Sequence, residues 1–245
     1  MHDLNDYLTP VNVAYLNNDL KYSESQFGNT IKIFDEYLPD LQGIDIVIIG
    51  INEFRGEGFI ADANSADAIR EQFYRLQYWH KDISIADFGN VKSGDSLVDS
   101  YSAAKIVIEE LLKLKKTVII LGGSHDNTLA QYNAYKSLGK IIEATIVDAK
   151  IDLKSESTAA SENFLMEMLT EEPNMVRHYN HIGFQSYFVS PKILETIDKL
   201  RFDCFRVGMA KENLEEMEPV IRNTDLMSFD ISAIKNSDAP ASYCS

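Results

Sequence analysis

Apolar runs of strand length, separated by helix-like segments, constrain the fold of this chain most. The first is a continuous β-branched run at 44–51, and others lie at 117–121 and 141–147. Continuous runs of this kind are typical of strands that are buried on both faces. The segments between them carry apolar residues at helical spacing. The alternation predicts an α/β protein, with parallel strands joined by right-handed crossovers and helices covering both faces of the sheet.

The same pattern gives a set of expected elements. Strands are expected at 44–51, 83–86, 117–121, 141–147, 181–184, 202–207 and 226–231. Helices are expected near 65–76, 99–112, 126–138, 162–170, 190–200 and 211–222. Residues 1–42 show no strong period, so we expect an N-terminal arm that packs on the domain formed by 43–245. No strand or helix pattern follows Ile231, and we therefore expect this domain to be incomplete at its C-terminus.

Charge and cysteine content exclude several classes of function. The 38 acidic residues against 23 basic residues give a formal net charge of −15. Nucleic acid and anionic membrane are therefore disfavoured as partners, because both require a positive surface. Cys204 and Cys244 are too few for a disulfide framework or a zinc site. Neither a secretory signal nor a membrane-length apolar run is evident, so we expect a cytoplasmic protein.

Three short polar segments carry the candidate chemistry, and each directly follows an apolar run. They are Gly122-Gly123-Ser124-His125-Asp126, Asp148-Ala149-Lys150-Ile151-Asp152 and Ser228-Phe229-Asp230-Ile231-Ser232. In open α/β sheets, functional groups gather at the carboxyl ends of the strands. Histidine and aspartate are ligands that hard divalent metals accept. The spacing therefore predicts a metal site built from side chains at several strand ends.

The residues of these segments and their order along the chain resemble the motifs of the ureohydrolase superfamily of arginases, agmatinases and formimidoylglutamases. Members carry Gly-Gly-Asp-His-Ser, Asp-Ala-His-x-Asp and Ser-x-Asp-x-Asp motifs. The segments at 50–52, 65–70 and 85–91 are similar to the family's upstream motifs, so the resemblance covers about 44–245. It implies a three-layer α/β/α fold and a pair of bridged Mn²⁺ ions that generate hydroxide. It also implies a small amino-acid or amine substrate and a homo-oligomer.

Carried over residue by residue, the resemblance assigns a full ligand set to one metal ion. Its positions are His125, Asp148, Asp152 and Asp230. The two ligands private to the second ion are replaced by Lys150 and Ser232. A lysine ammonium has no lone pair to offer a metal. The second metal is therefore expected to be absent, with at most one Mn²⁺ bound per chain.

Charge suggests a role for the lysine in this smaller site. Three carboxylates, the ammonium of Lys150 and one divalent ion sum to zero, as do four carboxylates and two ions in the intact family site. Lys150 is thus a possible surrogate for the second ion, held by Asp148 and Asp230. The first motif has its Asp and Ser exchanged around His125. Both departures weaken the expectation of dinuclear catalysis.

Substrate-binding positions are less well marked. The nearest match to the arginase Ser-x-Asn-x-His segment is 161–165, which makes Asn163 a weak candidate for substrate binding and places Leu165 at the histidine position. His178 and His181 lie at the entry to a strand and are expected to serve in packing or capping. Two functions stay open on this reading. One is a hydrolase of linear amidine or guanidine C–N bonds, of formimidoylglutamase ancestry, and the other is a pseudoenzyme that acts in binding or assembly.

Overall fold

The computed structural model describes residues 2–16, 22–58 and 64–239. The chain divides into two compact units, Met1–Ala134 and Tyr135–Ser245. Cys244 and the remainder of the expected incomplete C-terminus after residue 239 lie outside the described residues.

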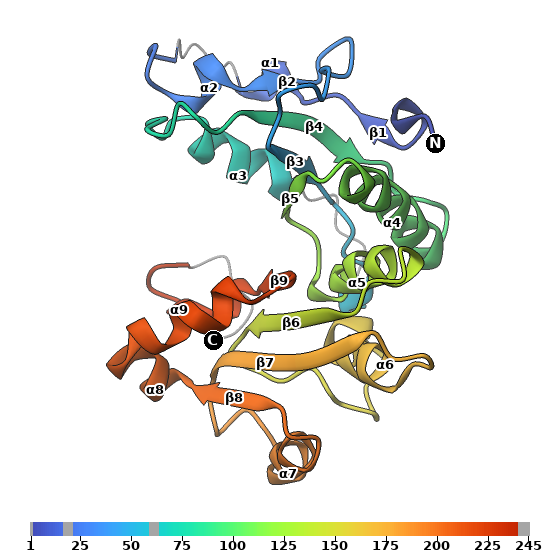
Figure 1. Cartoon of the computed structure of the whole chain (residues 1–245), viewed down its shortest axis with the longest axis vertical. Coiled ribbons are helices and arrows are strands. Elements are labelled where there is room, and N and C mark those ends of the chain that lie inside the picture. The colour runs from blue at the N-terminus through green and yellow to red at the C-terminus, as the bar shows by residue number, and fades with distance from the viewer. Residues whose placement is uncertain (1, 17–21, 59–63, 240–245) are drawn as a thin grey trace. The chain divides into compact units, whose positions relative to one another are not determined.

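The first unit is built on a mostly parallel sheet with the strand order β1-β4-β3-β5, with β2 also paired to β4. Its central strand, β3, runs parallel to both β4 and β5, whereas β1 pairs with β4 in the antiparallel sense. The strands are β1 (Leu8–Thr9), β2 (Lys32–Ile33), β3 (Ile46–Gly50), β4 (Ile85–Val91) and β5 (Thr117–Leu121) (Figure 1).

Helix α4 (Leu97–Lys113) covers this sheet because its apolar residues recur at helical spacing. Ala104, Val107 and Leu111 are buried in the core of the unit, where α4 packs on β4 and β5. The other helices of the unit are α1 (Val13–Leu16), α2 (Phe27–Thr30), α3 (Ser65–Phe73) and α5 (Thr128–Ser137), the last of which continues past residue 134.

The N-terminal residues contribute to the same core. Leu4, Leu8 and Phe34 are buried there together with Val47 and Ile49 of β3. The short strands β1 and β2 extend the sheet on the outer side of β4. The described part of residues 1–42 therefore belongs to the first unit, which it joins through both apolar contacts and strand pairing.

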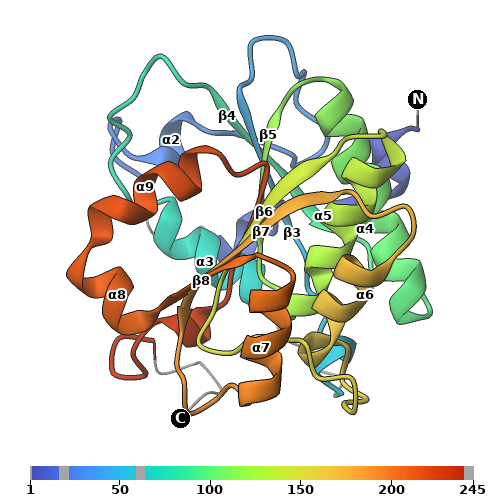
Figure 2. The ribbon, with the colours of Figure 1, turned by 60° about the horizontal axis from the view of Figure 1, so that its bottom comes forward.

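The second unit contains a four-stranded parallel sheet with the order β8-β7-β6-β9. The strands are β6 (Ile142–Val147), β7 (Val176–Phe184), β8 (Asp203–Arg206) and β9 (Leu226–Phe229), and the helices are α6 (Phe164–Thr170), α7 (Pro191–Lys199), α8 (Val207–Glu212) and α9 (Leu214–Arg222). The order reverses after β8, so right-handed crossovers place α6 and α7 on one face and α9 on the other (Figure 2). The predicted α/β fold with mostly parallel strands is confirmed.

The largest differences from the sequence-based expectations concern two strands and one helix. The strand expected over 83–86 runs from Ile85 to Val91, because β1 pairs with its last residues and Gly89 supplies a left-handed φ of 72°. The strand expected from 181 begins at Val176, where polar side chains masked a strand that pairs with β6. The helix expected over 211–222 is split at Asn213, whose backbone is not helical.

The described parts of the chain offer no helix with the length and apolar character that crossing a membrane requires.

Candidate functional site

The first polar segment leaves the end of β5 through two glycines in left-handed backbone conformations. Gly122 and Gly123 have φ values of 78° and 80°. A Cβ on Gly122 would lie 2.4 Å from Oγ of Ser65, so the close approach of α3 also requires glycine here. The chain then enters the short 3₁₀ turn His125–Asn127. This geometry places His125 directly beyond the carboxyl end of the strand, as predicted.

Ser124 ties this turn to the loop after β3. Its backbone N–H and its hydroxyl both donate to the carbonyl of Glu53, at 2.9 and 3.1 Å. The side-chain amide of Asn127 donates to the same carbonyl at 3.1 Å. The Glu53 carboxylate in turn forms a 2.5 Å ion pair with Arg55. The backbone on either side of His125 is thereby anchored within the first unit.

Asp126 follows His125, at the position where the family motif has its serine. Its side chain is fully buried and packs against the open face of Gly56, where a Cβ would lie 2.0 Å from Oδ1. The hydroxyl of Tyr101 on α4 donates to Oδ2. Burial raises the pKa of Asp126 despite the hydrogen bond from Tyr101. The exchange therefore turns the carboxylate toward helix α4 and the hydroxyl toward Glu53.

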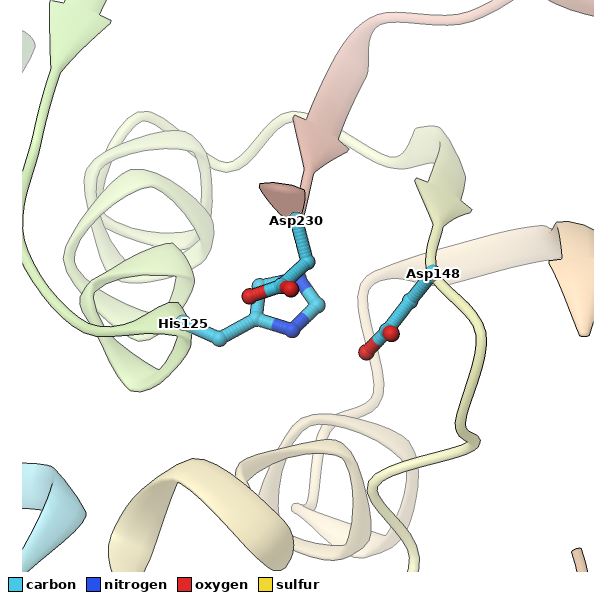
Figure 3. Close-up of side chains that lie close together, drawn as sticks. All are labelled: His125, Asp148 and Asp230. Carbon is cyan, nitrogen blue, oxygen red and sulfur yellow. The ribbon is translucent and has the colours of Figure 1, made fainter. Parts of the chain in front are cut away.

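The second and third polar segments meet in the second unit. Asp148 and Asp230 directly follow β6 and β9, which are adjacent parallel strands with Val147 opposite Phe229. A carboxylate oxygen of Asp148 lies within 4.8 Å of one from Asp230. Figure 3 shows both carboxylates turned toward the same region; His125, also labelled there, belongs to the first unit.

Ser232 links these two aspartates by hydrogen bonds. Its hydroxyl donates to Oδ1 of Asp148 at 2.5 Å, and its backbone N–H donates to Oδ1 of Asp230 at 2.7 Å. The backbone N–H of Lys150 adds a bond of 3.0 Å to the same Oδ1 of Asp148. The orientation of Asp148 is thus set by two donors that the second and third segments supply.

The other predicted site residues lie in or near the loop that follows β6. Lys150 is half-buried. The pKa of Glu162 is lowered mainly by hydrogen bonds from Lys154 and Ser157, and the positive charge of Lys150 lowers it further. Asp152 is buried but is not part of the close aspartate pair. The side-chain amide of Asn163 donates to the carbonyl of Ser157 at 2.8 Å, which gives this residue a role in the loop's own structure.

The aspartate pair fits a hard divalent cation. Such ions bind carboxylate oxygens at about 2.0–2.6 Å, so two ligands of one ion lie at most about 5 Å apart. The 4.8 Å limit between the two carboxylates satisfies this condition. Two aspartates side by side also repel each other unless a cation or protons compensate them. Sequence reasoning identified both aspartates but missed the hydrogen bonds that orient them.

One protein-family model matches most of the chain. The arginase family model matches residues 44–242, which is most of the chain and includes all three polar segments. The chain belongs to the arginase family. This assignment agrees with the resemblance that the three segments carry and with the α/β fold.

Among curated proteins, this arginase-family chain is similar to bacterial formimidoylglutamases. It is 28% identical over 163 residues to that of Macrococcus caseolyticus (strain JCSC5402), with 63% of this chain and 51% of the relative covered. It is 26% identical over 153 residues to that of Lysinibacillus sphaericus (strain C3-41), with coverages of 60% and 47%. The chain therefore spans about half the length of the curated relatives it matches.

Solved structures support the fold of this arginase-family chain. A Trypanosoma cruzi formiminoglutamase structure with Mn²⁺ aligns with a TM-score of 0.74 at 16% identity, covering 91% of this chain and 80% of that one. The Bacillus subtilis formimidoylglutamase aligns with a TM-score of 0.74 at 17% identity, with coverages of 91% and 76%. The Thermoplasma volcanium agmatine ureohydrolase gives 0.67 at 21% identity, with coverages of 90% and 75%.

Proposed function

We propose that this chain is a formimidoylglutamase-like member of the arginase family that binds one divalent metal ion and lacks the dinuclear activity. The observation that carries the proposal is the 2.5 Å hydrogen bond from Ser232 to Asp148. At the position where the family motif has a second aspartate, this chain has a hydroxyl that donates to a neighbouring carboxylate. A donor in that position occupies an oxygen that a bridging aspartate would offer to a second ion.

The ligands proposed for the single ion are His125, Asp148, Asp152 and Asp230. Support within the second unit comes from the close approach of Asp148 and Asp230 at adjacent strand ends. Support within the first unit comes from the anchored turn that presents His125. Manganese is the proposed metal, since a structural relative from Trypanosoma cruzi was solved with Mn²⁺.

A bound divalent ion would polarise a substrate atom or lower the pKa of water. The chain's own residues contribute orientation and charge balance. Ser232 and the backbone of Lys150 hold the Asp148 carboxylate. The ammonium of Lys150 supplies one positive charge beside the acidic segment, in the role we propose for it as a surrogate for the second ion. Asn163 is the residue proposed to contact the substrate.

The substrate class follows from the relatives. Formimidoylglutamases are the curated proteins that this chain resembles, and agmatine ureohydrolase is a structural relative. A linear amidine or guanidine, such as formiminoglutamate, agmatine or arginine, is therefore the ligand class to test. A cytoplasmic location and a homo-oligomeric state remain predictions from sequence and family resemblance.

The proposal is tested by counting metal ions. The purified chain is treated with Mn²⁺, dialysed and analysed by mass spectrometry for metal, alongside the variant Lys150→His/Ser232→Asp. We expect at most one ion per wild-type chain and two per repaired chain, because the variant restores the second ligand set. Lys192→His/Ser186→Asp makes the same residue changes at exposed positions and should match the wild type. Two ions in the wild type would overturn the proposal.

Activity separates the two functional outcomes. Release of urea, formamide and ammonia is measured from arginine, agmatine and formiminoglutamate with Mn²⁺. We expect turnover in the repaired variant only, since loss of the paired ions removes many powers of ten in rate. Robust turnover by the wild type would show a single-metal hydrolase. The alternative of a pseudoenzyme is favoured by Ser232, whose hydroxyl stands where the family motif has its second aspartate and donates to Asp148.

A further inference from the structure

Tyr179 and His181 form a buried chain of hydrogen bonds that ends on the backbone of Asp148. Both side chains are buried, with exposed fractions of 0% and 1%. The Tyr179 hydroxyl lies 2.7 Å from Nδ1 of His181, and Nε2 of His181 lies 3.0 Å from the carbonyl oxygen of Asp148. The three residues belong to the second unit, so this arrangement is internal to that unit.

The direction of each hydrogen bond follows from the chemistry of the partners. A carbonyl oxygen only accepts, so Nε2 of His181 carries the hydrogen and donates to Asp148. In a neutral imidazole the other nitrogen then accepts, and the Tyr179 hydroxyl donates to it. Burial raises the pKa of Tyr179 well above its ordinary value, and the charges of Cys204, Asp152 and Asp148 add to this. The hydroxyl therefore keeps its proton.

The backbone explains why a side chain reaches this carbonyl. The N–H of Asp148 donates to Ile182 at 3.1 Å, as in a parallel ladder. In regular register, the N–H of Phe184 would then donate to the Asp148 carbonyl. Instead Gly183 has a left-handed φ of 95°, and the next bond, at 2.9 Å, joins the N–H of Gln185 to Ala149. The imidazole of His181 therefore supplies the Asp148 carbonyl with a donor in place of the backbone N–H that a regular ladder would provide.

We propose that His181 and Tyr179 are positioning residues that fix the orientation of Asp148 and, through it, the affinity of the metal site. The imidazole fixes the peptide plane that follows the Asp148 Cα, while Ser232 and the Lys150 N–H fix its carboxylate. With both ends held, the carboxylate keeps one direction in the absence of metal. This proposal rests on the proposed function in its claim that the metal binds at Asp148.

Three substitutions separate the hydrogen bonds from packing. His181→Leu fills the space but removes both bonds, His181→Gln keeps an N–H donor near the position of Nε2, and Tyr179→Phe removes only the hydroxyl. Outer partners of metal ligands typically contribute 10–100-fold to metal affinity. By calorimetric titration with Mn²⁺, we expect about a ten-fold loss for His181→Leu, a smaller loss for Tyr179→Phe and an affinity close to wild type for His181→Gln.

A second readout does not depend on metal binding. Hydrogen exchange of the peptide covering 148–152 is measured in metal-free protein, where we expect faster exchange in His181→Leu and wild-type exchange in His181→Gln. Met168→Ala serves as the control, because this side chain is fully buried in α6 and neither bonds to nor adjoins Asp148 in sequence. It should lower the melting temperature while leaving both Mn²⁺ affinity and exchange at 148–152 unchanged.

The outcomes distinguish the two proposals. If the wild type binds no Mn²⁺ and His181→Leu still exchanges faster at 148–152, the metal proposal fails and the positioning of Asp148 stands. If the wild type binds Mn²⁺ and His181→Leu retains both wild-type affinity and wild-type exchange, the positioning proposal fails. Equal losses of affinity in His181→Leu and Met168→Ala would reduce His181 to a general packing role and would also overturn it.

Discussion

At the scale of single residues, buried charges in the first unit are matched by fixed partners. Arg70 is fully buried, and its guanidinium bonds to Asp87 at 2.8 and 2.9 Å and to Asp67 at 2.8 Å. Glu53, which is bonded to Ser124 of the first polar segment, also has a fixed partner. Arg55 binds its carboxylate through three nitrogen–oxygen contacts. Buried ion pairs of this type are costly to break, because the remaining partner keeps an uncompensated charge.

The Glu53–Arg55 pair predicts a specific acid sensitivity. Burial raises the pKa of Glu53, but hydrogen bonds from Arg55 and Ser100 and the Arg55 charge outweigh it and lower the pKa to about 2. The unfolded value is about 4.3. A lowered folded pKa stabilises the protein above the unfolded pKa, and this stabilisation is lost as the pH falls from about 4.3 toward 2.

The measurement is the free energy of unfolding in urea at steps between pH 5 and pH 2. Glu53→Gln should have a shallower decline over this range than the wild type, since its side chain does not titrate. Glu36→Gln, at an exposed position, is the matched control and should follow the wild type. An unchanged acid decline in Glu53→Gln would show that this pair does not govern acid stability.

At the scale of elements, helix starts and strand ends determine where functional groups lie. The long helix α4 begins at a capping box, in which Ser96 and Asp99 exchange hydrogen bonds between side chain and backbone. This helix carries Tyr101, whose hydroxyl bonds to Asp126 beside His125. The cap therefore stabilises an element that supports the first polar segment.

Removal of this cap should have a measurable cost. We expect Ser96→Ala to lower the free energy of unfolding by about 1 kcal/mol, because an N-terminal N–H of the helix loses its side-chain acceptor. Denaturant unfolding at neutral pH measures the change. Ser102→Ala lies in the interior of the same helix and is exposed, so it should be neutral or slightly stabilising. Equal effects of the two changes would argue against the capping role.

At the scale of the whole molecule, the chain carries a large excess of negative charge. The formal net charge is −15. Such an excess destabilises a compact state through repulsion among like charges, and dissolved salt screens this repulsion. The aspartates of the candidate site add to the effect, because they gather acidic groups in one part of the second unit.

Salt should therefore stabilise this protein. We expect the melting temperature to rise by a few degrees when NaCl is increased from about 0.05 to 0.5 M, where the Debye length falls from well over 10 Å toward 4 Å. The variant Glu36→Lys/Glu195→Lys lowers the acidic excess at exposed positions and should show a weaker dependence. A melting temperature that falls with salt would mean that surface ion pairs outweigh the net repulsion.

The sequence predicted the parts of the site that depend on strand order and failed where contacts depend on side-chain conformation. Asp148 and Asp230 follow apolar runs, so their place at strand ends could be inferred, and parallel pairing brings them together. The bond from Tyr101 to Asp126 joins residues 25 positions apart on different elements, and no periodicity signals it. His181 was expected to serve in packing, because nothing in the sequence marks the irregularity at Gly183.

The bond between Ser232 and Asp148 also bears on how the family motifs persist over evolution. Ser232 bonds to Asp148 through its hydroxyl and to Asp230 through its backbone N–H, so both aspartates also belong to the hydrogen-bond network of the second unit. Purifying selection on folding alone would then retain both aspartates in a lineage that has ceased to turn over a substrate. Under the proposed function, the residue at the Ser232 position would therefore mark retained chemistry among related chains better than the presence of Asp148 does.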